Sequence, residues 1–268
     1  MSAKIVIGVV AYDPKIVSIW EIIRDYSKEK NFEVDYLLFS NYESQVEALL
    51  NGKIDMAWNT NVAWIRTQKA NPSAKALLMR DTDIDFTSVF IAKEAKNFKS
   101  LEDLKGKKIA FGSKDSGQAY ILPVKYLKDH GLDYGKDYEP KRIDSDLGKH
   151  GDTGRSEYDA LEALKSGECD AAAIATGTWL RMVEVGLDGG DISVFWASEG
   201  YSHCNFTTIH LEQNLIDGFI NMMLSMDKSR SDIKNMMEME GLNRWVQPND
   251  YAFNGYKALA EAMEWVDC

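Results

Sequence analysis

One stretch of this chain occurs twice with few changes. The segments EALLNGKIDMA, residues 47–57, and EALKSGECDAA, residues 162–172, are identical at six of eleven positions and lie 115 residues apart. In both copies, helix-forming residues lead to a glycine, and an aspartate and a short apolar run follow. This order is typical of a helix that ends at glycine and is followed by a buried strand. The repeat therefore predicts two similar α/β lobes within one chain.

The sequence around both copies alternates between strand and helix patterns. Short β-branched or apolar runs predict strands, and apolar residues at helical spacing predict helices. The elements expected in the first half are strands at residues 4–10, 32–39 and 54–58, a helix that Pro14 opens, and a helix that Asn41 caps. Those expected in the second half are strands at residues 107–111 and 169–175 and helices at residues 116–130 and 156–164. This alternation indicates an α/β fold.

The expected architecture is two similar three-layer α/β lobes, joined by a two-strand hinge, with the ligand cleft between them. Lobe 1 is predicted to comprise residues 1–83 and 197–268, and lobe 2 residues 84–196. The chain is expected to leave lobe 1 within residues 78–86 and to return within residues 193–198. The C-terminal helices are expected to complete lobe 1, because their apolar residues recur at helical spacing.

Charge and hydropathy exclude several classes of partner. The net charge of −11 argues against nucleic acid or anionic membranes, because no basic patch offsets it. No apolar run reaches the roughly 18 residues that a membrane helix needs, so we expect no direct membrane insertion. The opening MSAKIVIGVV enters a strand directly, without the basic and apolar segments of a signal peptide.

Signatures of catalysis and of metal binding are weak. Cys169, Cys204 and Cys268 show no CxxC spacing, and no histidine has a partner at the spacing of metal ligands. We therefore expect no metal site and no cofactor. No P-loop, Ser-His-Asp set or pair of acids in a supporting context is present, so no catalytic residue is predicted.

Short neutral segments follow the predicted strands. In open α/β sheets, ligands bind beyond the carboxyl ends of the strands. The segments at these ends are residues 11–13, 59–61, 112–123 and 176–178. Within them, the Ser116-Gly117-Gln118 turn offers backbone N–H groups and a hydroxyl at a helix start, which together suit an anion. An ordinary helix cap at Ser116 explains the same residues equally well, and both interpretations stay open.

Three stretches resemble the substrate-binding proteins of phosphonate-type ABC transporters, a branch of the two-lobed type II periplasmic binding proteins. They are NYESQVEALLNGKIDMAW at residues 41–58, SLEDLKGKKIAFGSKDSGQAYILP at residues 100–123, and YDALEALKSGECDAAAI at residues 158–174. The second is similar to the family's S-L-x-D-L-K-G-K strand entry with its serine-rich anion loop. The resemblance implies a periplasmic receptor that closes around a small ligand and presents it to a membrane importer.

The sequence also departs from the family at positions that bear on selectivity. The family loop commonly reads Ser-Thr-Ser-Gly, whereas this chain has Ser116-Gly117-Gln118-Ala119. Thr60 and Asn61 stand where the family usually has Gly-Pro, and Tyr158 where it often has a ligand-contacting histidine. Thr176 replaces an acid that would meet the ammonium group in aminophosphonate binders. This loss argues against an amine-bearing phosphonate.

The predicted ligand contacts are mostly neutral hydrogen-bond donors at the strand ends. They are Tyr12, Tyr42, Asn59, Thr60, Phe86, Ser116, Gly117, Gln118, Tyr158, Thr176 and His203. Such donors can bind a phosphate-like oxyanion through several charge-assisted hydrogen bonds. Arg155 could add a positive charge at a helix start, although an exposed surface arginine is the alternative.

His203 and Cys204 raise the question of a nucleophile pair or a ligand pair for a soft metalloid. Adjacent residues on an extended segment point to opposite faces. We therefore expect that these two side chains do not share one site, and that Cys204 is a small buried residue.

The resemblance and the polar turns together predict a monomeric solute-binding receptor for a small tetrahedral oxyanion or phosphonate-like ligand. Phosphate, phosphite and arsenate are all admissible ligands. The expected partner is an ABC importer permease. The same receptor signalling to a sensor histidine kinase is an alternative, and so is an enzyme built on the same two-lobed fold.

Overall fold

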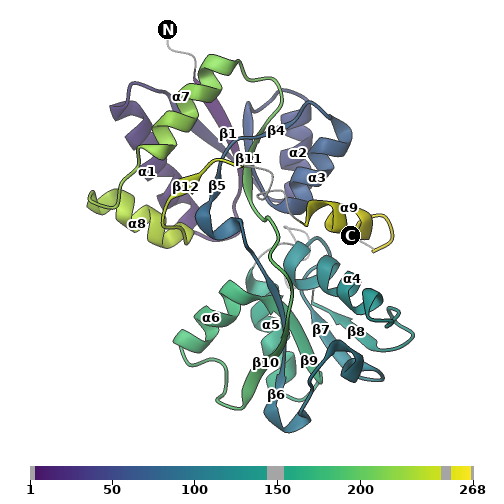
Figure 1. The fold of residues 1–268 in the computed structure, drawn as a ribbon. Helices are drawn as coiled ribbons and strands as arrows, with labels where there is room; N and C mark the ends of the chain where they lie inside the picture. The colour runs from purple at the N-terminus through teal and green to yellow at the C-terminus, as the bar shows by residue number, and fades with distance from the viewer. Residues whose placement is uncertain (1–3, 144–153, 249–254, 267–268) are drawn as a thin grey trace. The chain divides into compact units, whose positions relative to one another are not determined.

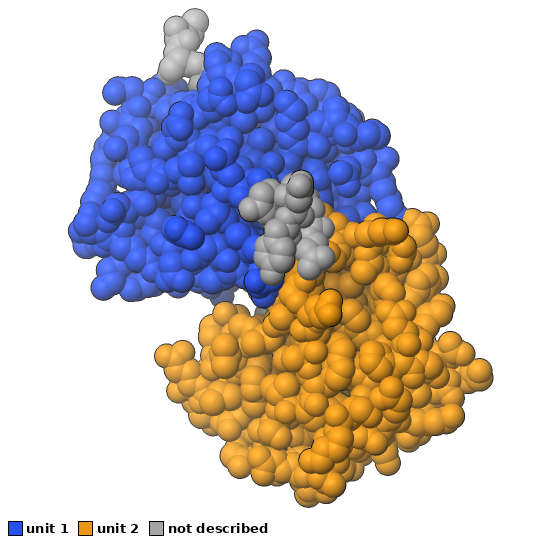
Figure 2. Space-filling model, viewed as in Figure 1, with its two compact units in different colours: residues 1–85, 202–254 blue, residues 86–201, 255–268 orange. Residues whose placement is uncertain are grey.

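The structure is a computed structural model that describes residues 4–143, 154–248 and 255–266. The chain divides into two compact units, which we call lobe 1 and lobe 2 (units 1 and 2 in Figure 2). Lobe 1 comprises Met1–Asp85 and Ser202–Asn254, and lobe 2 comprises Phe86–Tyr201 and Gly255–Cys268. Within the described residues, no helix has both the length and the apolar character required to cross a membrane.

Lobe 1 is built on a five-stranded sheet in the order β2-β1-β3-β11-β4 (Figure 1). The parallel strands are β2 (Val34–Phe39), β1 (Ile5–Val10) and β3 (Met56–Asn59). β11 (Asn205–Thr208) runs antiparallel to both β3 and β4 (Lys75–Ala76). The short strands β5 (Met79–Arg80) and β12 (Trp245–Val246) form a separate antiparallel pair.

Alternation along β1 gives lobe 1 its three layers. Ile5, Ile7 and Val9 pack with apolar residues of α1 (Lys15–Glu29), α7 (Gln213–Leu224) and α8 (Ser231–Glu240). Val6 and Val10, which point to the other face, pack with residues of α2 (Tyr42–Leu50), and α3 (Asn61–Ala70) joins them there. Successive side chains of a strand point to opposite faces, so one strand contributes to both apolar layers.

Lobe 2 repeats the plan with its sheet in the order β10-β6-β9-β7-β8. β7 (Lys108–Phe111) lies parallel between β8 (Glu139–Arg142) and β9 (Ala171–Ala175). β6 (Ser88–Lys93) pairs antiparallel with β9 and with β10 (Ile192–Ala197). The helices of lobe 2 are α4 (Leu122–Asp129), α5 (Gly154–Lys165), α6 (Thr176–Glu184) and α9 (Tyr256–Ala262). β8-β7-β9-β6 thus corresponds to β2-β1-β3-β11, as the repeat predicts.

The aspartate of each repeated segment has the same role in its lobe. Val6 N donates to Asp55 Oδ2 at 2.8 Å, and Asp55 N donates back to Val6 O at 2.9 Å. Lys108 N donates to Asp170 Oδ2 at 3.0 Å, and Asp170 N donates to Lys108 O at 2.7 Å. The preceding glycines, Gly52 and Gly167, have φ of 65° and 78°, which favours glycine where the helix ends. The repeated sequence therefore encodes the alignment of the first and third parallel strands.

Two details differ from the expected lobe boundaries. Residues 193–197 do not return the chain to lobe 1, because they belong to β10 and pair with β6. The chain crosses instead between Tyr201 and Ser202. The last helix, α9, also belongs to lobe 2, where it packs near α4 and Lys128 Nζ lies 4.0 Å from the centre of the Trp265 ring. Helical periodicity identifies an apolar face but not the partner that covers it.

We expect Asp55→Ala to lower the free energy of unfolding of lobe 1 by about 1–3 kcal/mol, because the N–H of Val6 loses its acceptor. Urea unfolding followed by tryptophan fluorescence measures this loss. The matched control is Glu47→Ala, which removes an exposed carboxylate from the same repeated segment. Equal stability of Asp55→Ala and Glu47→Ala would show that the carboxylate does not align the strands.

Candidate functional site

The Ser116-Gly117-Gln118 turn lies at the carboxyl end of β7, where a tight approach of backbone is required. Ser116 caps a π-helical turn, Gly117–Ile121, that leads into α4, and its Oγ accepts from Ala119 N at 3.2 Å. A Cβ at Gly112 would lie 2.7 Å from the Cβ of Ala119, so glycine allows this turn to pack against the strand end. The predicted helix start is confirmed, although its first turn is π-helical.

Serine hydroxyls gather beside this turn. Ser113 N donates to Ser156 Oγ at 3.3 Å, and the hydroxyls of Ser113 and Ser156 lie 3.4 Å apart. Ser116 N in turn donates to Ser113 O at 3.0 Å. All three serines are buried. The first amides of a helical turn have no acceptor within the turn, so hydroxyl and N–H donors concentrate at one end of β7.

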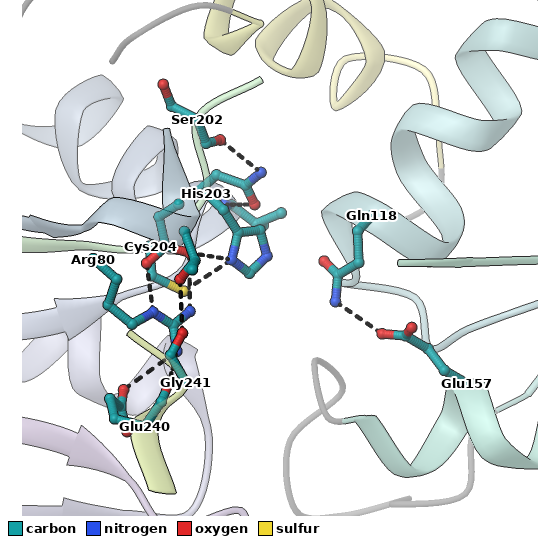
Figure 3. A network of polar contacts seen from close by, with 12 residues as sticks. Arg80, Gln118, Glu157, Ser202, His203, Cys204, Glu240 and Gly241 are labelled. Carbon is teal, nitrogen blue, oxygen red and sulfur yellow. Dashed lines mark hydrogen bonds and ion pairs between the residues drawn. The ribbon is translucent and has the colours of Figure 1, made fainter. Parts of the chain in front are cut away.

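Glu157 is a buried acid beside the turn that the sequence analysis missed (Figure 3). Its Oε1 accepts from Gln118 Nε2 at 3.3 Å, and its Oε2 accepts from Ala175 N at 2.7 Å. Glu157 is 2% exposed. Ala175 is the last residue of β9 and immediately precedes α6, so Glu157 connects the turn after β7 to the start of α6. The sequence feature that could have identified Glu157 is its position beside Tyr158, a predicted ligand contact, in the predicted helix at residues 156–164.

A second set of hydrogen bonds ties the same turn to β6. Ser88 Oγ donates to Gln118 O at 2.6 Å and lies 2.8 Å from the Tyr201 hydroxyl. The Thr176 hydroxyl lies 2.6 Å from that of Thr87, which precedes Ser88. Hydrogen bonds to the adjacent residues Thr87 and Ser88 therefore connect Thr176 with the Ser116-Gly117-Gln118 turn within lobe 2.

Other predicted contacts of lobe 2 are placed differently. Tyr158 is partly buried and packs against the core of this lobe. Phe86 exchanges two backbone hydrogen bonds with Tyr201, each 2.9 Å long, and their ring centres are 5.9 Å apart. Arg155 has a side chain that is 69% exposed and pairs with Asp159 at 3.1 Å. The exposed-arginine alternative therefore describes Arg155.

Three of the predicted contacts in lobe 1 are buried and make contacts within that lobe. Tyr42 is buried in a cluster with Val10 and Val46. Asn59 is completely buried, and its Oδ1 accepts from Gln45 Nε2 at 2.9 Å. Thr60 caps α3, with its hydroxyl accepting from Ala63 N at 3.3 Å.

Lobe 1 contains a buried charged cluster that the sequence analysis did not predict. Arg80 forms two hydrogen bonds with Asp83, Nε to Oδ2 at 2.6 Å and Nη2 to Oδ1 at 2.9 Å. Its Nη1 also lies 3.4 Å from a carboxylate oxygen of Glu240 (Figure 3). Burial alone would raise the pKa of Asp83, but the Arg80 guanidinium and His203 lower it to about 2. Burial raises the pKa of Glu240, and the Arg80 guanidinium offsets part of this rise.

His203 and Cys204 do share one site, contrary to the expectation. Cys204 Sγ lies 3.0 Å from His203 Nδ1, which is 3.4 Å from Asp83 Oδ1. The two residues precede β11, which begins at Asn205, so the alternation of an extended strand does not govern them. Burial would lower the pKa of His203, but the neighbouring sulfur and carboxylate raise it well above its usual range. Cys204 is buried, as expected.

Tyr12 lies at the edge of the same cluster. Burial raises the pKa of its phenol well above the usual range, and Glu240 raises it further. Tyr12 and His203 are thus the two predicted contacts that the structure brings to one place in lobe 1. The charged residues around Tyr12 and His203 are Arg80, Asp83 and Glu240, the last residue of α8. No sequence motif identified these three residues as part of a site.

The family described as "ABC transporter, phosphonate, periplasmic substrate-binding protein" matches residues 7–253 of this chain. A probable phosphite-binding protein of an ABC transporter from Prochlorococcus marinus is 22% identical over 253 residues, which are 90% of this chain and 82% of the relative. A phosphate-import protein from Mycolicibacterium smegmatis is 24% identical over 197 residues, 70% of this chain and 58% of the relative. These relatives are substrate-binding proteins rather than enzymes.

Solved structures resemble the whole chain. A Prochlorococcus marinus protein in complex with methylphosphonate has a TM-score of 0.76 at 17% identity, over 97% of this chain and 98% of that one. The periplasmic aliphatic sulphonate-binding protein of Escherichia coli has a TM-score of 0.64 at 18% identity, over 98% and 87% of the two chains. The predicted two-lobed α/β fold of periplasmic binding proteins is confirmed.

We expect Asp83→Asn to lower the free energy of unfolding by about 3–5 kcal/mol near neutral pH, because Arg80 and His203 lose their buried countercharge. The pKa of Asp83 is about 2 in the folded chain against an ordinary value of 3.8. A lowered pKa adds stability above the ordinary value and loses it as pH falls through the folded value. The difference in unfolding free energy between the wild type and Asp83→Asn should therefore narrow by about 2 kcal/mol as pH falls from about 5 to about 2.

Urea unfolding at a series of pH values measures that gap. Glu33→Gln, which neutralises an exposed carboxylate of lobe 1, is the control and should show little gap at any pH. A gap for Asp83→Asn that stays constant down to the lowest pH would contradict the role given to the Arg80–Asp83 pair.

Proposed function

We propose that this chain, which belongs to the family of phosphonate-binding periplasmic substrate-binding proteins of ABC transporters, captures a small tetrahedral oxyanion or phosphonate-like ligand by hinge closure. In this proposal, the closed form is presented to an ABC permease. We further propose that the chain acts as a monomer in the periplasm. Phosphite, phosphate and methylphosphonate are the ligands that the names of the relatives suggest.

The observation that carries the proposal is the donor-rich turn after β7. It combines the Ser116 cap, the amides at the start of the π-helical turn and the buried hydroxyls of Ser113 and Ser156. Each oxygen of a tetrahedral anion accepts two or three hydrogen bonds, and bonds to a charged acceptor are short and strong. Neutral donors at a helical N-terminus can therefore hold an oxyanion without a full countercharge.

Glu157 sets the charge state of the ligand in this proposal. Its Oε1 accepts from Gln118 Nε2 at 3.3 Å, so a hydrogen-bond acceptor lies beside the donors of the turn. An oxyanion that retains one proton can donate that proton to a carboxyl oxygen, whereas sulfate has no proton to donate. The site should therefore prefer hydrogen phosphate, hydrogen phosphite or a monoprotonated phosphonate over sulfate, which carries no proton at neutral pH.

We expect ligand-free protein to bind at least one of phosphite, phosphate and methylphosphonate, and to bind sulfate much more weakly. Ser116→Ala and Gln118→Ala should each weaken the tightest of these by about 1–3 kcal/mol, roughly 5- to 150-fold in Kd. Isothermal titration calorimetry after removal of co-purified ligand measures the affinities.

The matched control is Ser166→Ala, which removes an exposed hydroxyl at the far end of α5. It should bind like the wild type. Unchanged affinity in both Ser116→Ala and Gln118→Ala would remove this turn from the site. If the wild type binds none of the oxyanions tested, the proposed ligand class is overturned. Mass spectrometry of the co-purified ligand would then identify the compound.

A further inference from the structure

Three metal-binding side chains converge in the buried cluster of lobe 1. One ligand atom each from Asp83, His203 and Cys204 can be chosen so that all three lie within 4.8 Å of one another. All three residues are buried, with Asp83 at 0%, His203 at 6% and Cys204 at 7% exposure. We propose that Asp83, His203 and Cys204 form a binding site for a thiophilic divalent ion of the Zn²⁺ class.

The orientation of the imidazole separates this arrangement from a catalytic triad. In a triad the histidine uses one ring nitrogen toward the nucleophile and the other toward the acid. Here the same atom, Nδ1 of His203, faces Cys204 Sγ at 3.0 Å and Asp83 Oδ1 at 3.4 Å. Ligands bound at about 2.0–2.3 Å around one tetrahedral ion lie at comparable distances from each other. Convergence on one nitrogen is therefore the geometry of ligands around a common centre.

The backbone holds these ligands in place from two distant segments. Asp83 ends the 3₁₀ turn Asp81–Asp83, and His203 and Cys204 stand immediately before β11. His203 N donates to Asp83 O at 2.9 Å, which fixes the two segments together at the ligands themselves. Arg80 further orients the Asp83 carboxylate through two hydrogen bonds. Partners of this kind, behind a ligand, commonly fix its direction toward a metal.

The donor set suits a thiophilic divalent ion. A metal-bound cysteine is a thiolate and a metal-bound histidine is neutral, so the ion takes the place of protons on these ligands when it binds. A thiolate, an imidazole and a carboxylate are all ligands of Zn²⁺, and the thiolate disfavours Mg²⁺ and Ca²⁺.

The test uses the full chain without an affinity tag and with Cys268→Ser, which leaves Cys169 and Cys204 as its cysteines. After treatment with a chelator, the protein is titrated with Co²⁺ and then with Zn²⁺ in a phosphate-free buffer. We expect saturable uptake of about one equivalent, a thiolate-to-cobalt charge-transfer band in the near ultraviolet, and loss of that band when Zn²⁺ displaces Co²⁺.

Cys204→Ser should abolish the band and weaken Zn²⁺ binding by more than about 100-fold, because the loss of an outer partner alone costs about 10- to 100-fold. His203→Gln should weaken binding similarly. Cys169→Ser, which changes the buried cysteine of lobe 2, is the matched control and should retain the band.

Each contrary result overturns the proposal. Absence of saturable uptake by the unsubstituted site, or uptake without a thiolate band, would show that no such site exists. A band that persists in Cys204→Ser would assign it to another thiol. Circular dichroism checks that each variant is folded. If a variant does not fold, the metal titration of the protein with all three ligands intact still tests whether the site exists.

Discussion

The alignment of the first and third parallel strands is the constraint on which each lobe depends. Asp55 and Asp170 hold the start of β1 and of β7 through a carboxylate and a backbone N–H. Because parallel strands in register end at the same edge of the sheet, this alignment also sets where the polar turns after these strands meet. The Ser116 turn and the residues that follow β9 come together in lobe 2 for this reason, as do Tyr12 and the end of β3 in lobe 1.

The two lobes then use this shared plan for different chemistry. Lobe 2 surrounds its turn with neutral hydroxyls and amides, beside the buried acids Glu157 and Asp115. Lobe 1 instead buries a guanidinium, two carboxylates, an imidazole and a thiol in contact with one another. Neutral donors suit a small exchangeable anion, whereas a cluster of buried charges requires fixed partners and a more rigid surrounding.

Much of this organisation follows from local sequence, and the rest does not. The repeat, the glycines after α2 and α5, the caps at Asn41 and Ser116 and the strand ends were predictable, because each depends on residues close in sequence. The pairing of Arg80 with Glu240 was not, because the two residues lie far apart in the chain and no motif links them. His203 and Cys204 were expected to point apart because an extended strand was expected there, but β11 begins only at Asn205. The placement of α9 depended on which lobe offers a complementary apolar surface, and periodicity carries no information on that.

The position of α9 makes each lobe discontinuous in sequence. The chain passes from one lobe to the other after Asp85, after Tyr201 and again after Asn254, so each lobe is assembled from two separate segments. Tyr256, Leu259 and Ala262 of α9 are buried, and they belong to lobe 2 although the residues just before them in the sequence belong to lobe 1. During synthesis, lobe 2 therefore cannot complete its packing until α9 has been made, which is after the last segment of lobe 1 has been made.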